Sequence, residues 1–133
     1  MSNELESLDH IPADHMEQVE AIAKMCHEVN QAYTAVIREP LKHWHELEQP
    51  EKDGVIEHVA FLIINIDADA KAWHDAWVAK MIVAGWKYGP KRSIKSKTHE
   101  HLKPFHHLPE KQQVKDALFH SVVKQAIHAE QDK

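Results

Sequence analysis

Apolar residues recur every three to four positions along most of the chain, which is the spacing of one face of an α-helix. The first such stripe predicts a helix from about Asp14 to Ile37. Asp14 followed by Glu17 has the pattern of a helix start, and Pro40 ends the element. The apolar positions of this helix are Met16, Val19, Ile22, Ala23, Cys26, Val29, Tyr33, Val36 and Ile37.

The next stretch contains a short element and a second helix. Residues 40–53 carry two prolines and Trp44, which favours a short helical turn or an ordered loop. From about Pro50 to Asn65 the pattern predicts a helix that is apolar on nearly all sides, as a buried central helix is. A strand over residues 61–66 remains open, because short apolar runs fit both structures.

A third helix is expected from about Asp69 to Ala84, with Trp73, Trp77, Met81 and also Ile82 as candidates for its inward face. Gly85 ends this helix, as glycine often does. Beyond it, residues 86–90 alternate large apolar and polar side chains, which is typical of a short β-strand.

Residues 91–108 form a basic, histidine-rich segment, in which we expect the pairing strand around Leu102 to Phe105. The last helix starts near Pro109, and its apolar face is Val114, Ala117, Leu118, Val122, Ala126 and Ile127. The predicted fold class is therefore mainly α, with about four helices and a small β-hairpin. We expect one domain over residues 13–133, preceded by a flexible leader over residues 1–12.

Composition agrees with a single helical domain. A chain of 133 residues with three glycines and six prolines is long enough for one core and poor in turns. The net charge of −5 lacks the basic footprint of a nucleic-acid binder. One cysteine, Cys26, suits a reducing compartment, and the longest apolar run, residues 59–66, is too short to span a membrane. We expect a cytoplasmic protein without a signal peptide, a nucleic-acid partner or a membrane partner.

Charge is distributed unevenly along the chain. Residues 87–103 hold six lysines and arginines against the single acid Glu100, whereas residues 4–28 are rich in carboxylates. This asymmetry indicates either a local anion site or complementary surfaces for self-association into a homo-oligomer, and a solvated basic loop is the alternative.

The aromatic and basic residues suggest one kind of ligand. A purine stacks on flat rings, of which the chain has Tyr33, Trp44, Trp77, Trp86 and Tyr88. Arg92 could bind a phosphate through two hydrogen bonds, with Lys80 and Lys97 as point charges, although solvent exposure explains these cations equally well. Core packing is the simpler interpretation of Trp77. Trp86 and Tyr88 lie on one side of a strand, where they form part of the core or a ligand wall.

The sequence contains few features that would indicate a metal site or a catalytic site. The thirteen histidines include three close pairs, at 43 and 45, 99 and 101, and 106 and 107, but no metal-binding motif with ligand spacing. Neutral surface histidines explain them better. No nucleophile motif or phosphate-binding glycine loop is present, so we expect no cofactor, no metal and no enzymatic activity.

The segment from His74 to Lys80, together with Gly-Trp-Lys-Tyr-Gly-Pro at 85–90, resembles the core signature of the ryanodine-receptor (RyR) repeat family. In that family a helix with H-D/E-x-W leads into G-W-x-Y-G. Further matching positions are Arg92, Lys97, His99, Pro104, Leu108 and Pro109. Residues 26–33, 54–55 and 115–119 are similar to single-repeat bacterial and phage members, so the likeness covers roughly residues 17–128. Ser93 replaces the usual aspartate, and Glu100 replaces the proline after the histidine.

The resemblance implies a compact unit of helices with a small β-hairpin, and it suggests recognition of a nucleotide-derived signal. One pair of repeats in ryanodine receptors looks like a site for adenine nucleotides, and prokaryotic members occur among nucleotide-signalling and phage-conflict proteins. We therefore expect an adenine-nucleotide-derived signal to be bound by His27, Glu28, Asn30, Tyr33, Lys80, Trp86, Tyr88, Arg92, Lys97 and His99. The repeats of ryanodine receptors also resemble clamps against neighbouring domains, so a protein-interaction or oligomeric assembly module is the alternative.

Overall fold

The computed structural model describes residues 13–131, and within this range the protein is mainly helical, as predicted. Its four α-helices are α1 (Ala13–Val36), α2 (Gln49–Ile64), α3 (Ala70–Val83) and α4 (Glu110–Gln131). Two short strands, β1 (Lys87–Tyr88) and β2 (Thr98–His99), and two single-turn 3-10 helices, η2 (Trp44–Glu46) and η3 (Phe105–His107), complete the fold. The leader predicted for residues 1–12 lies outside the described residues.

The helix boundaries follow local signals in the sequence. The Asp69 carboxylate accepts a hydrogen bond from the backbone N–H of Ala72 at 2.9 Å and so caps the start of α3. At the start of α2, the Glu48 backbone N–H donates to the Glu51 carboxylate at 3.0 Å, as in a capping box. Residues 61–64 belong to α2, so the alternative of a strand there is wrong.

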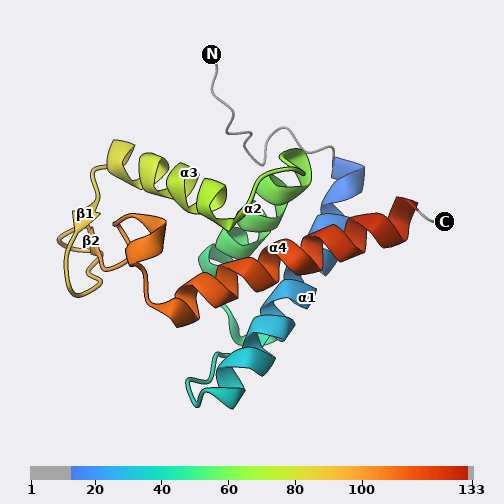
Figure 1. Ribbon diagram of the computed structural model, residues 1–133, viewed down its shortest axis with the longest axis horizontal. Helices are drawn as coiled ribbons and strands as arrows, with labels where there is room; N and C mark the ends of the chain where they lie inside the picture. Colours follow the sequence, from blue (N-terminus) through green and yellow to red (C-terminus); the bar gives the residue numbers. More distant parts are fainter. Residues whose placement is uncertain (1–12, 132–133) are drawn as a thin grey trace.

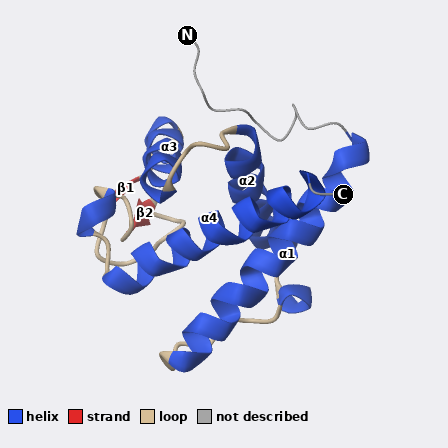
Figure 2. Ribbon diagram, turned by 45° about the vertical axis from the view of Figure 1, so that its right-hand side comes forward, coloured by secondary structure: helices blue, strands red, loops and turns tan. Residues whose placement is uncertain are grey.

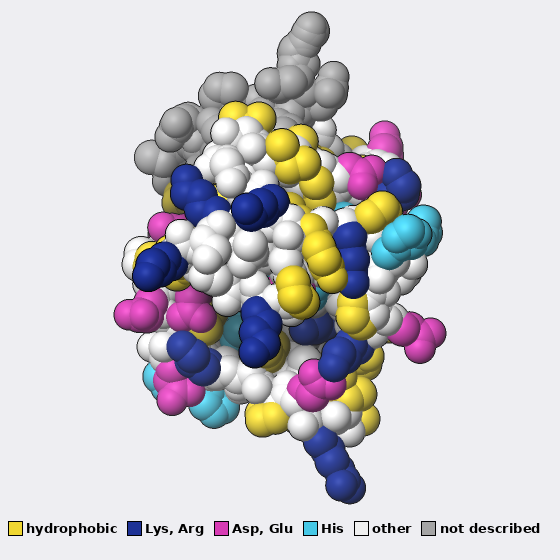
Figure 3. Space-filling view, turned by 90° about the vertical axis from the view of Figure 1, so that its left-hand side faces the viewer, with side chains coloured by type: hydrophobic (Ala, Val, Ile, Leu, Met, Phe, Trp, Pro, Cys, Tyr) yellow, Lys and Arg dark blue, Asp and Glu magenta, His cyan; other side chains and the backbone are white. Residues whose placement is uncertain are grey.

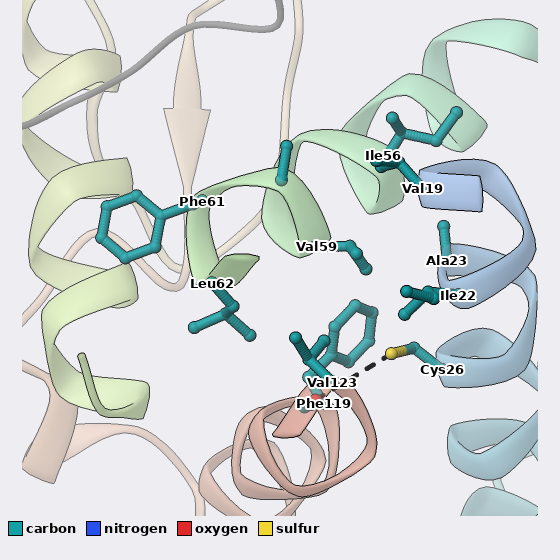
Figure 4. Close-up of a cluster of buried hydrophobic side chains, with 11 residues drawn as sticks. Val19, Ile22, Ala23, Cys26, Ile56, Val59, Phe61, Leu62, Phe119 and Val123 are labelled. Carbon is teal, nitrogen blue, oxygen red and sulfur yellow. Dashed lines mark hydrogen bonds between the residues drawn. The ribbon is translucent and has the colours of Figure 1, made fainter. Parts of the chain in front are cut away.

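The main core lies between α1, α2 and α4. In Figures 1 and 2, α4 crosses α1. Val59, Leu62 and Val123 are at most 2% exposed and meet between these helices (Figure 4). Burial of each such side chain contributes about 1.5–3 kcal/mol. Cys26 also lies in this core, where its Sγ donates a weak hydrogen bond to the Phe119 carbonyl oxygen at 3.9 Å.

On two helices the buried face differs from the predicted one. In α4 the fully covered positions are Asp116, Phe119 and Val123, whereas Ala117 is exposed. In α3 the buried residue is His74, and Ile82 is 59% exposed because this end of α3 extends beyond the other helices. A polar residue therefore takes an inward position on each helix. Among the described residues, no helix is long and apolar enough to cross a membrane.

The two strands form a small parallel sheet at the end of the molecule next to the C-terminus of α3 (Figures 1 and 2). Lys87 pairs with Thr98 and Tyr88 with His99. The pairing strand is thus earlier than the predicted segment 102–105, and the predicted hairpin is wrong because the two strands run parallel. Leu102 and Phe105 are instead buried, at 8% exposed each, and their burial holds the segment after β2 against the helices.

Two glycines permit this arrangement. Gly85 has φ +94°, and the N–H groups of Gly85 and Trp86 donate to the carbonyls of Ile82 and Met81, which is a Schellman motif ending α3. A Cβ on Gly89 would lie 2.6 Å from the Thr98 Cβ, so only glycine lets the two strands approach.

Candidate functional site

A cavity of about 260 Å³, here called the α3–α4 cavity, lies at the end of the molecule that carries the strands. Helix α3 provides its aromatic wall, the segment after β1 provides an arginine and two histidines, and α4 provides two polar side chains. Trp73 and Trp77 on α3, like Gln112 and Asp116 on α4, are four positions apart, which places each pair on one face of its helix. The lining residues are Trp73, His74, Trp77, Arg92, His99, His101, Leu108, Gln112 and Asp116.

The aromatic wall is held in place from behind by a buried histidine. The His58 ring stacks on Trp73 at 4.3 Å between ring centroids and on Phe119 at 4.2 Å. Burial lowers the pKa of His58 to about 3, helped by the nearby His120, so the ring between these aromatic partners is neutral. This stack gives Trp73 a defined orientation at the cavity.

His74 ties the basic segment to α3. Its Nε2 donates to the backbone carbonyl of Lys103 at 2.6 Å, and the side chain is almost fully buried. A buried donor matched to a buried acceptor is a strong constraint on the loop, because breaking the pair would leave both groups unsatisfied. The sequence motif residue His74 is therefore primarily a positioning residue.

A backbone hydrogen bond determines which ring nitrogen of His99 carries the proton. Its Nδ1 accepts a hydrogen bond from the backbone N–H of His101 at 3.0 Å, so in the neutral ring the proton is on Nε2. Burial and the nearby Arg92 lower the pKa of His99. Glu100 Oε1 lies 3.6 Å from Nδ1, but a neutral ring that already accepts there forms no ion pair. Burial also lowers the pKa of His101, to about 4.

Two charged groups of opposite sign lie at different depths of the cavity. The Arg92 side chain is 56% exposed and forms a two-point ion pair with Glu100, at 3.0 and 3.3 Å. Asp116 is only 7% exposed and accepts a hydrogen bond from Gln112 Nε2 at 3.2 Å. Burial raises the pKa of Asp116 to about 6. The cavity thus has an acidic inner group and a cation near its opening.

Of the residues predicted to bind the ligand, Arg92 and His99 line the cavity, and Trp86 lies beside them with its ring 6.4 Å from that of His99. Other predicted residues have different partners. Lys80 forms an ion pair with Glu57, and Lys97 donates to the Ala84 carbonyl at 2.9 Å. Tyr88 is 53% exposed, with the ammonium group of Lys103 5.8 Å from its ring centroid.

The four predicted residues on α1 do not line the cavity. His27 Nε2 donates to the Lys42 carbonyl at 2.7 Å, and Asn30 Nδ2 donates to the Lys115 carbonyl at 3.4 Å. Glu28 is exposed beside Lys24, with 3.9 Å between the charged atoms, and Tyr33 is partly buried. These side chains join α1 to a loop and to α4, or face solvent.

Sequence reasoning did not select Asp116 and Gln112 as site residues. Both residues lie in register with Phe119 and Val123, on the inward face of α4. A carboxylate at a core-facing position of the sequence pattern is the feature that could have identified Asp116 as a site residue. The sequence pattern indicates other roles for four further lining residues, as apolar, paired or motif positions and not as ligand contacts: Trp73, His74, His101 and Leu108. Among residues 13–131, no three histidine, cysteine or acidic side chains gather as a metal-binding set.

Comparison with known proteins identifies the family. The family model described as "RyR domain" matches residues 62–129, which is just over half of the chain. No curated protein is similar enough in sequence to be matched. All nine residues of the α3–α4 cavity lie inside the matched segment, whereas α1 precedes it. The signature predicted from the sequence is confirmed, and the chain belongs to the RyR domain family.

Proposed function

We propose that this RyR domain binds a small anionic molecule with a flat ring, of the adenine-nucleotide type, in the α3–α4 cavity. The observation that carries the proposal is the convergence of two tryptophans, a neutral histidine and an arginine on one hollow. Stacking of a base on an aromatic face contributes about 1–3 kcal/mol. A guanidinium supplies two parallel hydrogen bonds to a phosphate.

The size of the cavity suits one end of such a ligand. Pockets for drug-sized molecules have volumes of roughly 300–1,000 Å³, and the 260 Å³ here lies just below that range. A base or nucleoside would fill the cavity and leave its phosphates at the opening beside Arg92. Glu100 would have to release Arg92, but an exposed ion pair contributes only about 0–1 kcal/mol.

The lining chemistry favours binding over catalysis. It includes no serine, threonine, cysteine or lysine as a nucleophile, and the His99 Nε2–H is a neutral donor for a polar ligand atom. Cys26 is buried in the core, and burial raises its thiol pKa to about 12, so it is unreactive. We propose a sensor or a sponge for a nucleotide signal in the cytoplasm.

Calorimetric titration and thermal shift of the full chain with ATP, ADP-ribose and cyclic nucleotides test this function. We expect at least one of them to bind and to raise the melting temperature, because a ligand that binds only the folded state stabilises it. Arg92→Gln should weaken a phosphate-bearing ligand about tenfold and leave adenosine unaffected. Lys24→Gln, an exposed cation on α1, is the matched control. Indifference of the wild-type protein to every nucleotide would remove the proposal.

A second candidate function, assembly with another copy of the chain, is supported by a different surface. Val83 is 89% and Ile94 83% exposed, and in the same stretch of chain Lys87, Lys91 and Lys95 form no ion pair among the described residues. Figure 3 shows lysines and arginines interspersed with hydrophobic side chains on this end of the molecule. Exposed apolar groups of this kind often mark contact surfaces.

The acidic side of α1 offers the opposite charge for such a contact, through the exposed side chains of Glu17 and Glu20. Light scattering over a wide concentration range tests the assembly. We expect a concentration-dependent dimer or larger species that Lys91→Glu with Lys95→Glu dissociates. A strictly monomeric wild-type mass at high concentration would contradict it.

A further inference from the structure

We infer that Asp116 recognises the inner end of the ligand and selects a ring that carries an amino group, such as adenine. This assignment rests on the proposed function, since it concerns the same cavity. The inference goes beyond the proposed function in two respects. It names Asp116 as a residue that determines specificity, and it states that the buried edge of the ligand carries an amino group.

The first observation is that Asp116 is buried without a cation. It is 7% exposed, and no lysine, arginine or histidine of the described chain lies within ion-pair distance of its carboxylate. Lys115 is near enough to lower its pKa somewhat, but burial dominates. Buried acids are usually paired, because an unpaired buried charge is strongly unfavourable.

The second observation is the position of the group. Asp116 borders the α3–α4 cavity, and its one hydrogen bond in the described structure comes from Gln112, which also borders the cavity. A carboxylate can accept several hydrogen bonds, so it retains acceptor capacity. Elsewhere in the protein a half-satisfied buried acid would only destabilise the fold. At a cavity wall its remaining capacity is available to a ligand.

The third observation is the order of charges across the cavity. Arg92 is 56% exposed near the opening, whereas Asp116 lies deep. An anionic group placed deep would face the carboxylate, so the ligand must enter with its anion toward Arg92 and a hydrogen-bond donor toward Asp116. His99 and His101, which also line the cavity, are neutral and add no charge that would reverse this polarity.

An aminopurine fits this order. Its exocyclic amino group donates to a carboxyl oxygen. Burial raises the pKa of Asp116 to about 6, so the carboxyl can be protonated near neutral pH. The protonated carboxyl can also donate a hydrogen bond to the adjacent ring nitrogen. Against the tryptophan wall of α3, the ring would be oriented with its amino edge inward and its ribose and phosphate outward.

Paired titrations with AMP and purine riboside 5′-monophosphate test the inference, because these nucleotides differ only in the amino group. We expect the wild-type protein to bind AMP about tenfold more tightly, since the analogue leaves a buried acceptor unsatisfied. Asp116→Asn should keep the preference, because its amide offers an acceptor and a donor. Asp116→Leu should bind both nucleotides equally.

A purely structural role for Asp116 would change stability but not the ratio of the two affinities. Asp116→Leu should fold, since an apolar side chain replaces a buried acid that has no cation partner. Thermal unfolding checks this. Equal binding of the two nucleotides to wild type, or a preference retained by Asp116→Leu, would overturn the role of Asp116 and leave nucleotide binding intact. Failure of AMP and its analogue to bind would overturn the adenine assignment, and only if ATP, ADP-ribose and cyclic nucleotides also fail would the proposed function be overturned with it.

Discussion

The α3–α4 cavity and the polar face of α1 contain similar residues and use them differently. His74 in the cavity and His27 on α1 each donate from Nε2 to a backbone carbonyl, at 2.6 and 2.7 Å. On α1 the Asn30 Nδ2 is bonded to α4 and Glu28 is exposed to water, whereas the Asn30 Oδ1 is buried without a partner in the described structure but does not border the cavity. In the cavity, Asp116 and the Nε2–H of His99 keep hydrogen-bonding capacity beside a hollow of about 260 Å³.

The difference shows that polarity on a helix face does not by itself indicate a binding site. A site needs polar groups that the fold leaves unsatisfied and a concave surface that excludes water from them. The RyR domain match covers the cavity residues and not α1. The comparison can be tested by changing one region while measuring ligand affinity and stability together.

The largest expected effect is on ligand binding after Trp77→Leu. Loss of a stacking face should weaken AMP binding about tenfold to a hundredfold, because base–aromatic stacking contributes about 1–3 kcal/mol. Calorimetry measures the affinity, and thermal unfolding confirms that the variant is folded. Trp44→Leu is the matched control, since Trp44 packs near His27 on the α1 side. An equal loss of AMP affinity in both variants would contradict the assignment of binding to the cavity and not to the α1 side.

An intermediate effect is expected on acid stability. Burial lowers the folded-state pKa of His58 to about 3 and that of His101 to about 4, so the unfolded chain binds protons there below pH 6.5 and stability falls as the pH decreases. Asp116 acts oppositely, because its raised pKa of about 6 lets the folded state hold a proton above the ordinary value of 3.8.

Together, these three groups predict that wild-type stability falls by on the order of 1 kcal/mol per pH unit between about pH 6 and 4.5. His58→Leu should make this region nearly flat, and Asp116→Asn should roughly double the slope. Urea unfolding at several pH values measures both. A slope unchanged by His58→Leu would mean that the ring behind Trp73 titrates normally and that the cavity wall is hydrated.

The smallest expected effects come from α1. His27→Ala should cost about 1–2 kcal/mol of unfolding free energy, because the Lys42 carbonyl loses its donor, and AMP affinity should not change. Glu28→Gln is the companion control, since its exposed pair with Lys24 contributes about 0.5 kcal/mol or less. Denaturant titration and calorimetry measure both properties. A tenfold weaker affinity in Glu28→Gln would return α1 to the binding site.

The sequence by itself determined the helices, their ends and the family. Helical periodicity and caps act within a few residues, so Pro40, Asp69 and Gly85 mark boundaries without knowledge of the fold. The signature around Trp77 and Gly85 predicted the RyR family, and the same stretch contains Arg92 and His99, which do line the cavity.

Only the tertiary structure decided which polar residues meet at the cavity. Lys80 and Lys97 have the chemistry of phosphate ligands, but Glu57 and the Ala84 carbonyl bind them. Asp116 follows Trp77 by 39 positions, and both border one hollow because α3 and α4 pack together. Burial and the satisfaction of polar groups depend on such distant neighbours, and residue spacing along one chain does not encode them directly.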